Sequence, residues 1–188
     1  MSYIKSQLET VWHLFVFFLS VYLLHQSEKF HLENILDLRI GAGKFLILAL
    51  MSGALCIASD MLLFSQEDLS NRAQPFYWVV QKNHFYVVMY VALATLSQEF
   101  LRVTLLQYSW LLMLIVTFVI GFPHFFLGSG YRVVGVLLRS ILLGKVFLHT
   151  NTVWIPIAAN IMFMIYLLNR AALFDFMVTP DGKTPSEE

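Results

Sequence analysis

Residues 84–106 read HFYVVMYVALATLSQEFLRVTLL, an apolar run that is interrupted by Gln98, Glu99 and Arg102. A helix needs about 17 to 25 mainly apolar residues to cross the hydrocarbon core of a bilayer, and this run is long enough. Charged side chains within such a helix are costly unless they face the protein interior, a partner or water. The stretch therefore predicts a membrane-spanning helix whose polar positions mark the place to look for a function.

The rest of the chain has the same apolar character. Of its 188 residues 59% are hydrophobic and 13% are charged, and the mean hydropathy is +0.71. This composition is too apolar for a soluble domain of this length and predicts an integral membrane protein. We expect one all-α polytopic bundle of about six transmembrane helices over residues 1–178, followed by a disordered polar tail over 179–188. The predicted spans are 8–24, 45–64, 84–106, 110–127, 133–148 and 153–168.

Charge and residue usage exclude several classes of partner and cofactor. The formal net charge is zero and no run of Lys or Arg occurs, so nothing indicates nucleic acid as a partner. Six His and the single Cys56 form no CxxC or HExxH pattern, so we expect neither a metal nor another cofactor. The distribution of Lys and Arg around the spans favours both termini in the cytoplasm. The spans and the lack of organelle-targeting signatures favour a bacterial inner membrane.

Polar residues also interrupt three other apolar runs, at His124, Arg139 and Asn160. With a helical rise of about 1.5 Å per residue, these three and Glu99 lie at similar depths in one leaflet. Convergence of this kind is what a buried polar site requires. The alternative is that Glu99, Arg102 and Arg139 form a charge-neutralising cluster that only fixes the packing of the helices.

Three blocks of the second half of the chain resemble a known family. The block SQEFLRVTLLQ at 97–107 resembles the EExxxR helix of the CAAX protease and bacteriocin-processing family, also called CPBP or Abi, which are glutamyl intramembrane proteases. The block IGFPH at 120–124 falls where that family has FxxxH, and LLGKVFLHTNTVWIPIAAN at 142–160 resembles its closing segment GLLLGYLYLRTGSLWPAILAH. The resemblance implies a protease-like helical core over residues 85–168.

Most of the family's active-site positions carry other residue types in this chain. Only Arg102 and His124 match outright. The remaining positions fall on Ser97 and Gln98 for the two glutamates, Ile120 for the phenylalanine of FxxxH, Asn160 for the second histidine, and Phe163 or Met164 for the asparagine. The family's matching base and asparagine are therefore absent.

The substitution of the base leads to our first hypothesis. A glutamine cannot accept a proton at ordinary pH, so Gln98 could orient a water but could not act as a general base. We therefore expect a degenerate protease site in a non-catalytic subunit or adaptor. Its old active-site cavity would hold a transmembrane segment, a peptide or a lipid. The residues expected to line this cavity are Gln98, Arg102, His124, Arg139 and Asn160.

The alternative is an active intramembrane endopeptidase that uses Glu99 as its base. His124 would then orient the attacking water, and Asn160 would supply the contact to the oxyanion. Glu99 lies one residue beyond Gln98, and its side chain is rotated by about 100° around the helix. Either the helix is locally rewound to bring Glu99 inward, or the catalytic pair is lost. This hypothesis requires Glu99 and His124 to lie within one water of each other.

Overall fold

The described part of each predicted apolar run folds as a helix, and in the computed structural model the described residues form an all-helical bundle. The structure describes residues 2–37, 40–63, 84–121 and 131–177. Within these ranges the elements are α1 (Ser2–His25), α2 (Leu32–Ile35), α3 (Ala42–Leu63), α6 (His84–Tyr108), α7 (Trp110–Gly121), α9 (Tyr131–Thr150) and α10 (Trp154–Met177). The prediction of an all-α fold is confirmed for this part of the chain, and the predicted tail 179–188 lies outside it.

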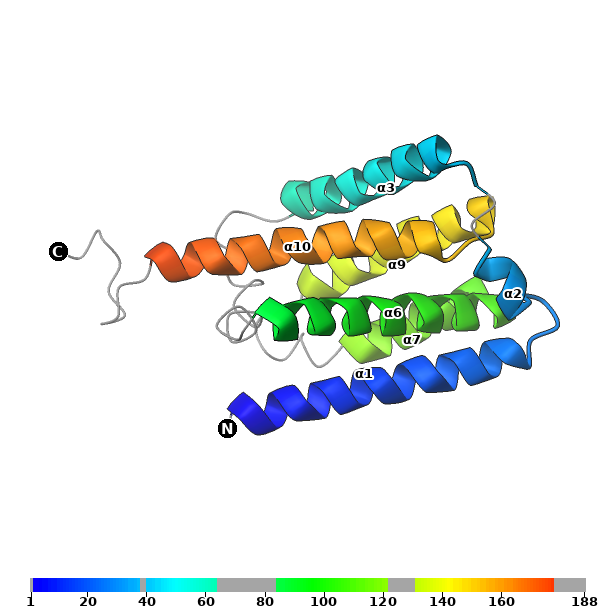
Figure 1. Ribbon diagram of the computed structural model, residues 1–188, viewed down its shortest axis with the longest axis horizontal. Coiled ribbons are helices and arrows are strands. Elements are labelled where there is room, and N and C mark those ends of the chain that lie inside the picture. Colours follow the sequence, from blue (N-terminus) through cyan, green and yellow to red (C-terminus); the bar gives the residue numbers. More distant parts are fainter. Residues whose placement is uncertain (1, 38–39, 64–83, 122–130, 178–188) are drawn as a thin grey trace.

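The axes of the longer helices are roughly aligned with one another, and α1 begins at the end of the bundle at which α10 ends (Figure 1). Two of the described helices are long and apolar enough to cross a membrane, over Ala42–Leu62 in α3 and Val133–Thr150 in α9. Shorter apolar stretches cover Thr10–His25, Trp110–Val119 and Trp154–Asn169. The predicted helical bundle is thus confirmed for the described residues. Two of its helices are clear candidates for membrane spans, and six spans are not confirmed. The central helix α6 carries Gln98, Glu99 and Arg102, which lower its hydropathy.

Helix α1 packs against α6 through one face. Its buried residues Val16, Ser20 and Leu24 recur at helical spacing. Phe17 lies on the same face, and its ring centre is 5.1 Å from that of Phe100 in α6, at a steep angle. The opposite face of α1 leaves large apolar and aromatic side chains exposed, namely Val11, Trp12, Leu14, Phe15, Phe18, Leu19 and Tyr22.

Helix α3 packs against α10 through small residues. Ala49, Ser52 and Cys56 are buried on this face. A Cβ atom on Gly53 would lie 2.8 Å from the Met162 sulfur, so the glycine leaves room for the Met162 side chain of α10. Small residues at helix–helix contacts are typical of membrane bundles, where close packing replaces the hydrophobic effect between helices.

The turn between α9 and α10 is held by α2. Helix α9 ends at Thr150, and the next residue, Asn151, has a φ of 52°. Its backbone N–H donates to the Phe147 carbonyl at 2.7 Å, an αL termination. The Ile35 carbonyl at the end of α2 accepts the Val153 N–H at 2.9 Å. The indole N–H of Trp154 donates to the Leu36 carbonyl at 2.8 Å. Helix α2 thus has only four residues, and its contacts fix the start of α10.

The interior of the bundle is most polar around α6, which contacts α1, α7, α9 and α10. Its buried polar residues are Thr95, Ser97, Glu99, Arg102 and Thr104. The outer faces of α1, α3 and α7 instead expose large apolar side chains. The bundle therefore combines an apolar core that contains buried polar groups around α6 with large apolar side chains on its outer faces.

Candidate functional site

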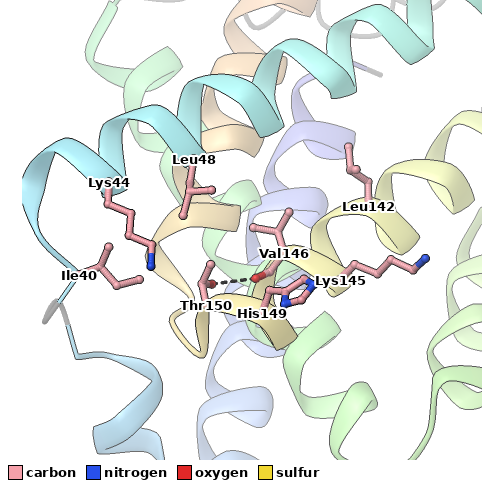
Figure 2. Close-up of a pocket in the computed structure, with 8 residues that line it drawn as sticks. All are labelled: Ile40, Lys44, Leu48, Leu142, Lys145, Val146, His149 and Thr150. Carbon is pink, nitrogen blue, oxygen red and sulfur yellow. Dashed lines mark hydrogen bonds between the residues drawn. The ribbon is translucent and has the colours of Figure 1, made fainter.

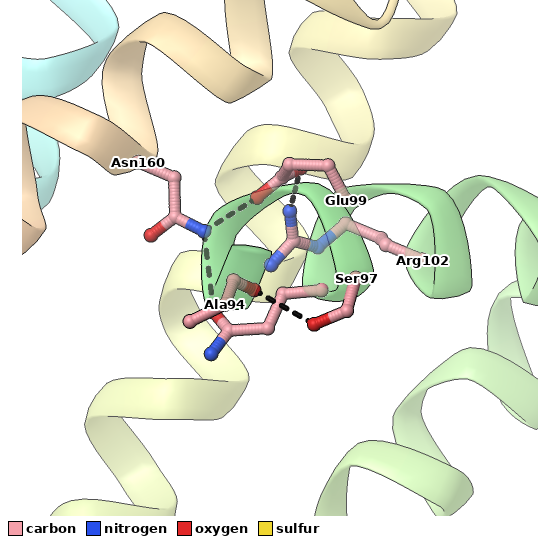
Figure 3. Close-up of polar contacts among 6 residues, drawn as sticks. Ala94, Ser97, Glu99, Arg102 and Asn160 are labelled. Atoms are coloured by element: carbon pink, nitrogen blue, oxygen red, sulfur yellow. Dashed lines mark hydrogen bonds and ion pairs between the residues drawn. The ribbon is translucent and has the colours of Figure 1, made fainter. Parts of the chain in front are cut away.

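The site is built around Glu99, which is 0% exposed in the middle of α6. Its Oε2 atom forms an ion pair with Nη1 of Arg102, three residues later on the same helix. Its Oε1 atom accepts a hydrogen bond of 2.8 Å from Nδ2 of Asn160 in α10. Figure 3 shows Asn160 reaching across from α10 to this carboxylate. Both carboxylate oxygens of Glu99 therefore have a protein partner.

Asn160 is also 0% exposed, and its amide group has two acceptors on α6. Besides the bond to Glu99, its Nδ2 donates to Oε1 of Gln98 at 3.2 Å. A carboxylate can only accept hydrogen bonds, so Glu99 fixes which way the amide of Asn160 points. An amide nitrogen carries two N–H groups, and here each has an acceptor. We call Gln98, Glu99, Arg102 and Asn160 the α6–α10 polar cluster.

Two neighbouring positions of α6, Gln98 and Glu99, both reach Asn160. Helix α6 is α-helical from His84 to Tyr108, so no local rewinding brings Glu99 inward. Glu99 faces the interior because α6 is packed among four other helices. A side chain that points about 100° away from Gln98 therefore still meets protein. The sequence alone left open whether Glu99 faces the interior. The helices packed around α6 bury it there without any change in the helix.

Arg139, the other predicted site residue with a described side chain, lies on α9. Its guanidinium carbon is 4.0 Å from the centre of the Phe163 ring on α10, a cation–π contact. Phe163 follows Asn160 by three residues and shares its face of α10. Arg139 thus joins α9 to α10 beside the α6–α10 polar cluster.

His124 lies outside the described residues. The geometric requirement of the protease hypothesis, one water between Glu99 and His124, is therefore not tested. The side chain of Ile120, at the position of the family's FxxxH phenylalanine, also lies outside the described residues.

Sequence reasoning missed a second polar contact of α6, which involves His13. Ser97 Oγ lies 2.9 Å from the Ala94 carbonyl oxygen and 2.7 Å from Nδ1 of His13 in α1. A hydroxyl has one proton, so Ser97 donates to only one of these two groups, and the tautomer of His13 sets the direction of the bond between them. The only available signal was a histidine within the first apolar run, since the two residues are 84 positions apart.

Comparison of the chain with protein-family models, with curated proteins and with solved structures gives no match. The resemblance to the CPBP family therefore stays a prediction that is based on the three sequence blocks alone.

Proposed function

We propose that this chain is an integral membrane protein with a degenerate CPBP-like site, and that it acts as a non-catalytic subunit or adaptor of a membrane assembly. Its occupant would be a transmembrane segment, a peptide or a lipid. The apolar outer faces of α1, α3 and α7 support membrane integration, because a soluble protein rarely exposes so much contiguous apolar surface. We place both termini in the cytoplasm of a bacterial cell, as the Lys and Arg distribution predicts.

One observation carries the non-catalytic assignment: the catalytic atoms that a protease would need are engaged with one another. A general base requires a carboxylate that can reach a water, and both oxygens of Glu99 contact Arg102 or Asn160. An oxyanion site requires a free donor, and the N–H groups of Asn160 point to Gln98 and Glu99. The α6–α10 polar cluster thus holds two helices together.

Two buried polar atoms of this cluster have no hydrogen-bond partner among the described residues. They are Asn160 Oδ1 and Arg102 Nε. One is an acceptor on α10 and the other is a donor on α6. Leaving both unsatisfied costs free energy, which the ion pair and the hydrogen bonds of the cluster must outweigh.

The contact between Glu99 and Asn160 also supports the proposed kinship with the CPBP family. Glu99 lies in the first of the three resembling blocks, and Asn160 closes the third. In the structure these blocks meet at a hydrogen bond of 2.8 Å. The family's reaction would require the same two helices to meet.

The alternative function is an active intramembrane endopeptidase in which Glu99 is the base and the neighbouring Asn160 contacts the oxyanion. In this case the contacts of Glu99 would rearrange when a substrate enters. His124 would then supply the group that orients the water. The two functions predict different results when the Glu99 carboxylate is removed. Only a protease would then stop cleaving its substrate.

The test is a pulldown from native membranes in mild detergent, followed by mass spectrometry of the co-purifying chains. Wild type is compared with Glu99→Gln/Arg102→Gln, which removes the base without leaving an unpaired buried charge. Glu28→Gln, which changes an exposed acid beyond the end of α1, is the matched control. Extraction of the membranes with alkaline carbonate checks integration separately.

The adaptor function predicts one stoichiometric partner that all three proteins retain. An intact protein that accumulates only with the double variant would be an uncleaved substrate, and it would make this chain a protease. Release of the chain by carbonate would contradict membrane integration.

A further inference from the structure

An open pocket of about 400 Å³ lies between the first turns of α3 and the last turns of α9. It shares no lining residue with the α6–α10 polar cluster. Figure 2 shows the two helices on either side of it, with side chains from both pointing into the space between them. The pocket therefore lies at the end of the bundle where α3 begins and α9 ends.

The polar side of the pocket is basic. Lys44, Lys145 and His149 line it, and the described lining residues include no carboxylate. Lys44 points from α3 toward His149, while Lys145 extends away on the far side of His149 (Figure 2). All three side chains are exposed, and neither lysine has an ion-pair partner among the described residues. Two flexible ammonium groups can therefore turn toward an anion.

The start of α3 adds a partial positive charge to the same place. Lys44 is in the first turn of this 22-residue helix, where backbone N–H groups have no partner within the helix. A Cβ atom on Gly41 or Gly43 would have no neighbour within 4 Å, so an anion can approach the backbone there. A phosphate group suits this combination of N–H groups and lysines.

The other side of the pocket is apolar, formed mainly by Leu48, Leu142 and Val146. The helices that carry these residues, α3 and α9, are the two whose length and composition suit a membrane span. Beyond the pocket α3 exposes Leu46, Ile47 and Leu50. An apolar wall thus continues from the basic end of the pocket along the outside of the bundle.

We propose that this pocket binds an anionic phospholipid, with its phosphate at Lys44, Lys145 and His149 and an acyl chain along Leu48 and Val146. The proposal rests on the membrane integration in the proposed function. Basic pockets between membrane helices on the cytoplasmic side bind anionic headgroups in this way. With both termini in the cytoplasm, this pocket lies at the opposite end of the bundle (Figure 1) and would make the same contacts in the outer leaflet. An inorganic phosphate would use the basic end alone and would leave the apolar wall without a role.

The experiment uses the full chain in nanodiscs of equal parts phosphatidylglycerol and phosphatidylcholine. Native mass spectrometry after gentle release measures which lipid stays bound. Lys44→Gln and Lys145→Gln each remove one pocket charge, and Val146→Trp fills the pocket while keeping both charges. Lys29→Gln is the charge-matched control, since Lys29 lies at the same end of the bundle and contacts the Leu106 carbonyl and the Phe30 ring.

Wild type should retain phosphatidylglycerol in preference to phosphatidylcholine. Each pocket lysine variant should bind about fivefold less of it, the contribution of one basic side chain near an anionic surface. Val146→Trp should also lose the lipid, while Lys29→Gln and the charge-retaining Lys44→Arg should keep it. Circular dichroism and gel filtration check that each variant is folded.

Equal lipid binding by all the variants would overturn the proposal. Displacement of the bound lipid by inorganic phosphate would identify a free-anion site, and it would overturn the lipid assignment. If the chain stays in membranes under alkaline carbonate but shows no preference for phosphatidylglycerol, the lipid proposal alone fails. Release by carbonate would instead contradict membrane integration, on which both proposals depend.

Discussion

Helix α6 has two polar interfaces of different kinds. Toward α10 it presents an ion pair, Glu99 with Arg102, which Asn160 completes. Toward α1 it presents neutral groups: Ser97 meets His13 at 2.7 Å, and Thr104 Oγ1, which donates to the Phe100 carbonyl at 2.8 Å, lies 3.3 Å from the Ser20 carbonyl. Charged groups in a low-dielectric interior must be fully paired, whereas neutral groups need one partner each. The α10 side should therefore tolerate substitution much less well than the α1 side.

The largest expected effect comes from breaking the ion pair on the α10 side. Arg102→Met keeps most of the side-chain volume but leaves the Glu99 carboxylate buried without its cation. Breaking a buried pair in this way costs about 3–5 kcal/mol of the free energy of unfolding. Denaturation in detergent, followed by circular dichroism, measures this loss.

The control is the neutral double variant Glu99→Gln/Arg102→Met. Asn160 keeps an amide oxygen as its acceptor there, and no charge remains buried, so much of the stability should return. If Arg102→Met alone were as stable as wild type, the α6–α10 polar cluster would not hold the helices together. The two interfaces of α6 would then be energetically alike.

An intermediate effect is expected from Asn160→Leu. It removes both hydrogen bonds from α10 to α6 and leaves the Glu99–Arg102 pair in place. Hydrogen bonds between membrane helices contribute on average about 0.6 kcal/mol and at most about 1.7 kcal/mol each, so a loss of roughly 1–2 kcal/mol is expected. The same denaturation experiment measures it.

Asn169→Leu is the matched control for Asn160→Leu. It changes the same residue type on the same helix at an exposed position, and its effect should stay within about 0.5 kcal/mol. Equal losses for both variants would show that the hydrogen bonds of Asn160 contribute nothing specific.

The helical fold could be predicted because length and apolar composition are local properties of the sequence. The runs at 45–64 and 133–148 fall on the two helices that are long and apolar enough to cross a membrane. Helix rise alone also gives Glu99 and Asn160 similar depths, and the structure places them in contact. Depth along a helix follows from counting residues, so it needs no knowledge of the neighbours.

The direction of each side chain could not be predicted in the same way. Helix α6 is apolar around most of its circumference, so no stripe indicates which face is buried. Whether Gln98 or Glu99 points inward depends on α1, α7, α9 and α10, which surround the helix. The pocket at Lys44 and Lys145 was missed for a related reason, because it forms where two helices distant in sequence meet.

The smallest expected effect is on the α1 side, at His13 and Ser97. A double-mutant cycle of His13→Leu, Ser97→Ala and the pair should give a coupling free energy of about 0.6 kcal/mol, the average for a neutral contact between membrane helices. The cycle isolates the contact because each single change already removes the same hydrogen bond. As a control, His13→Leu combined with Thr104→Val should be additive, since Thr104 lies seven residues and about 10 Å further along α6. A His13–Ser97 coupling as large as the loss in Arg102→Met would abolish the difference between the two interfaces. It would also identify His13 as part of the site.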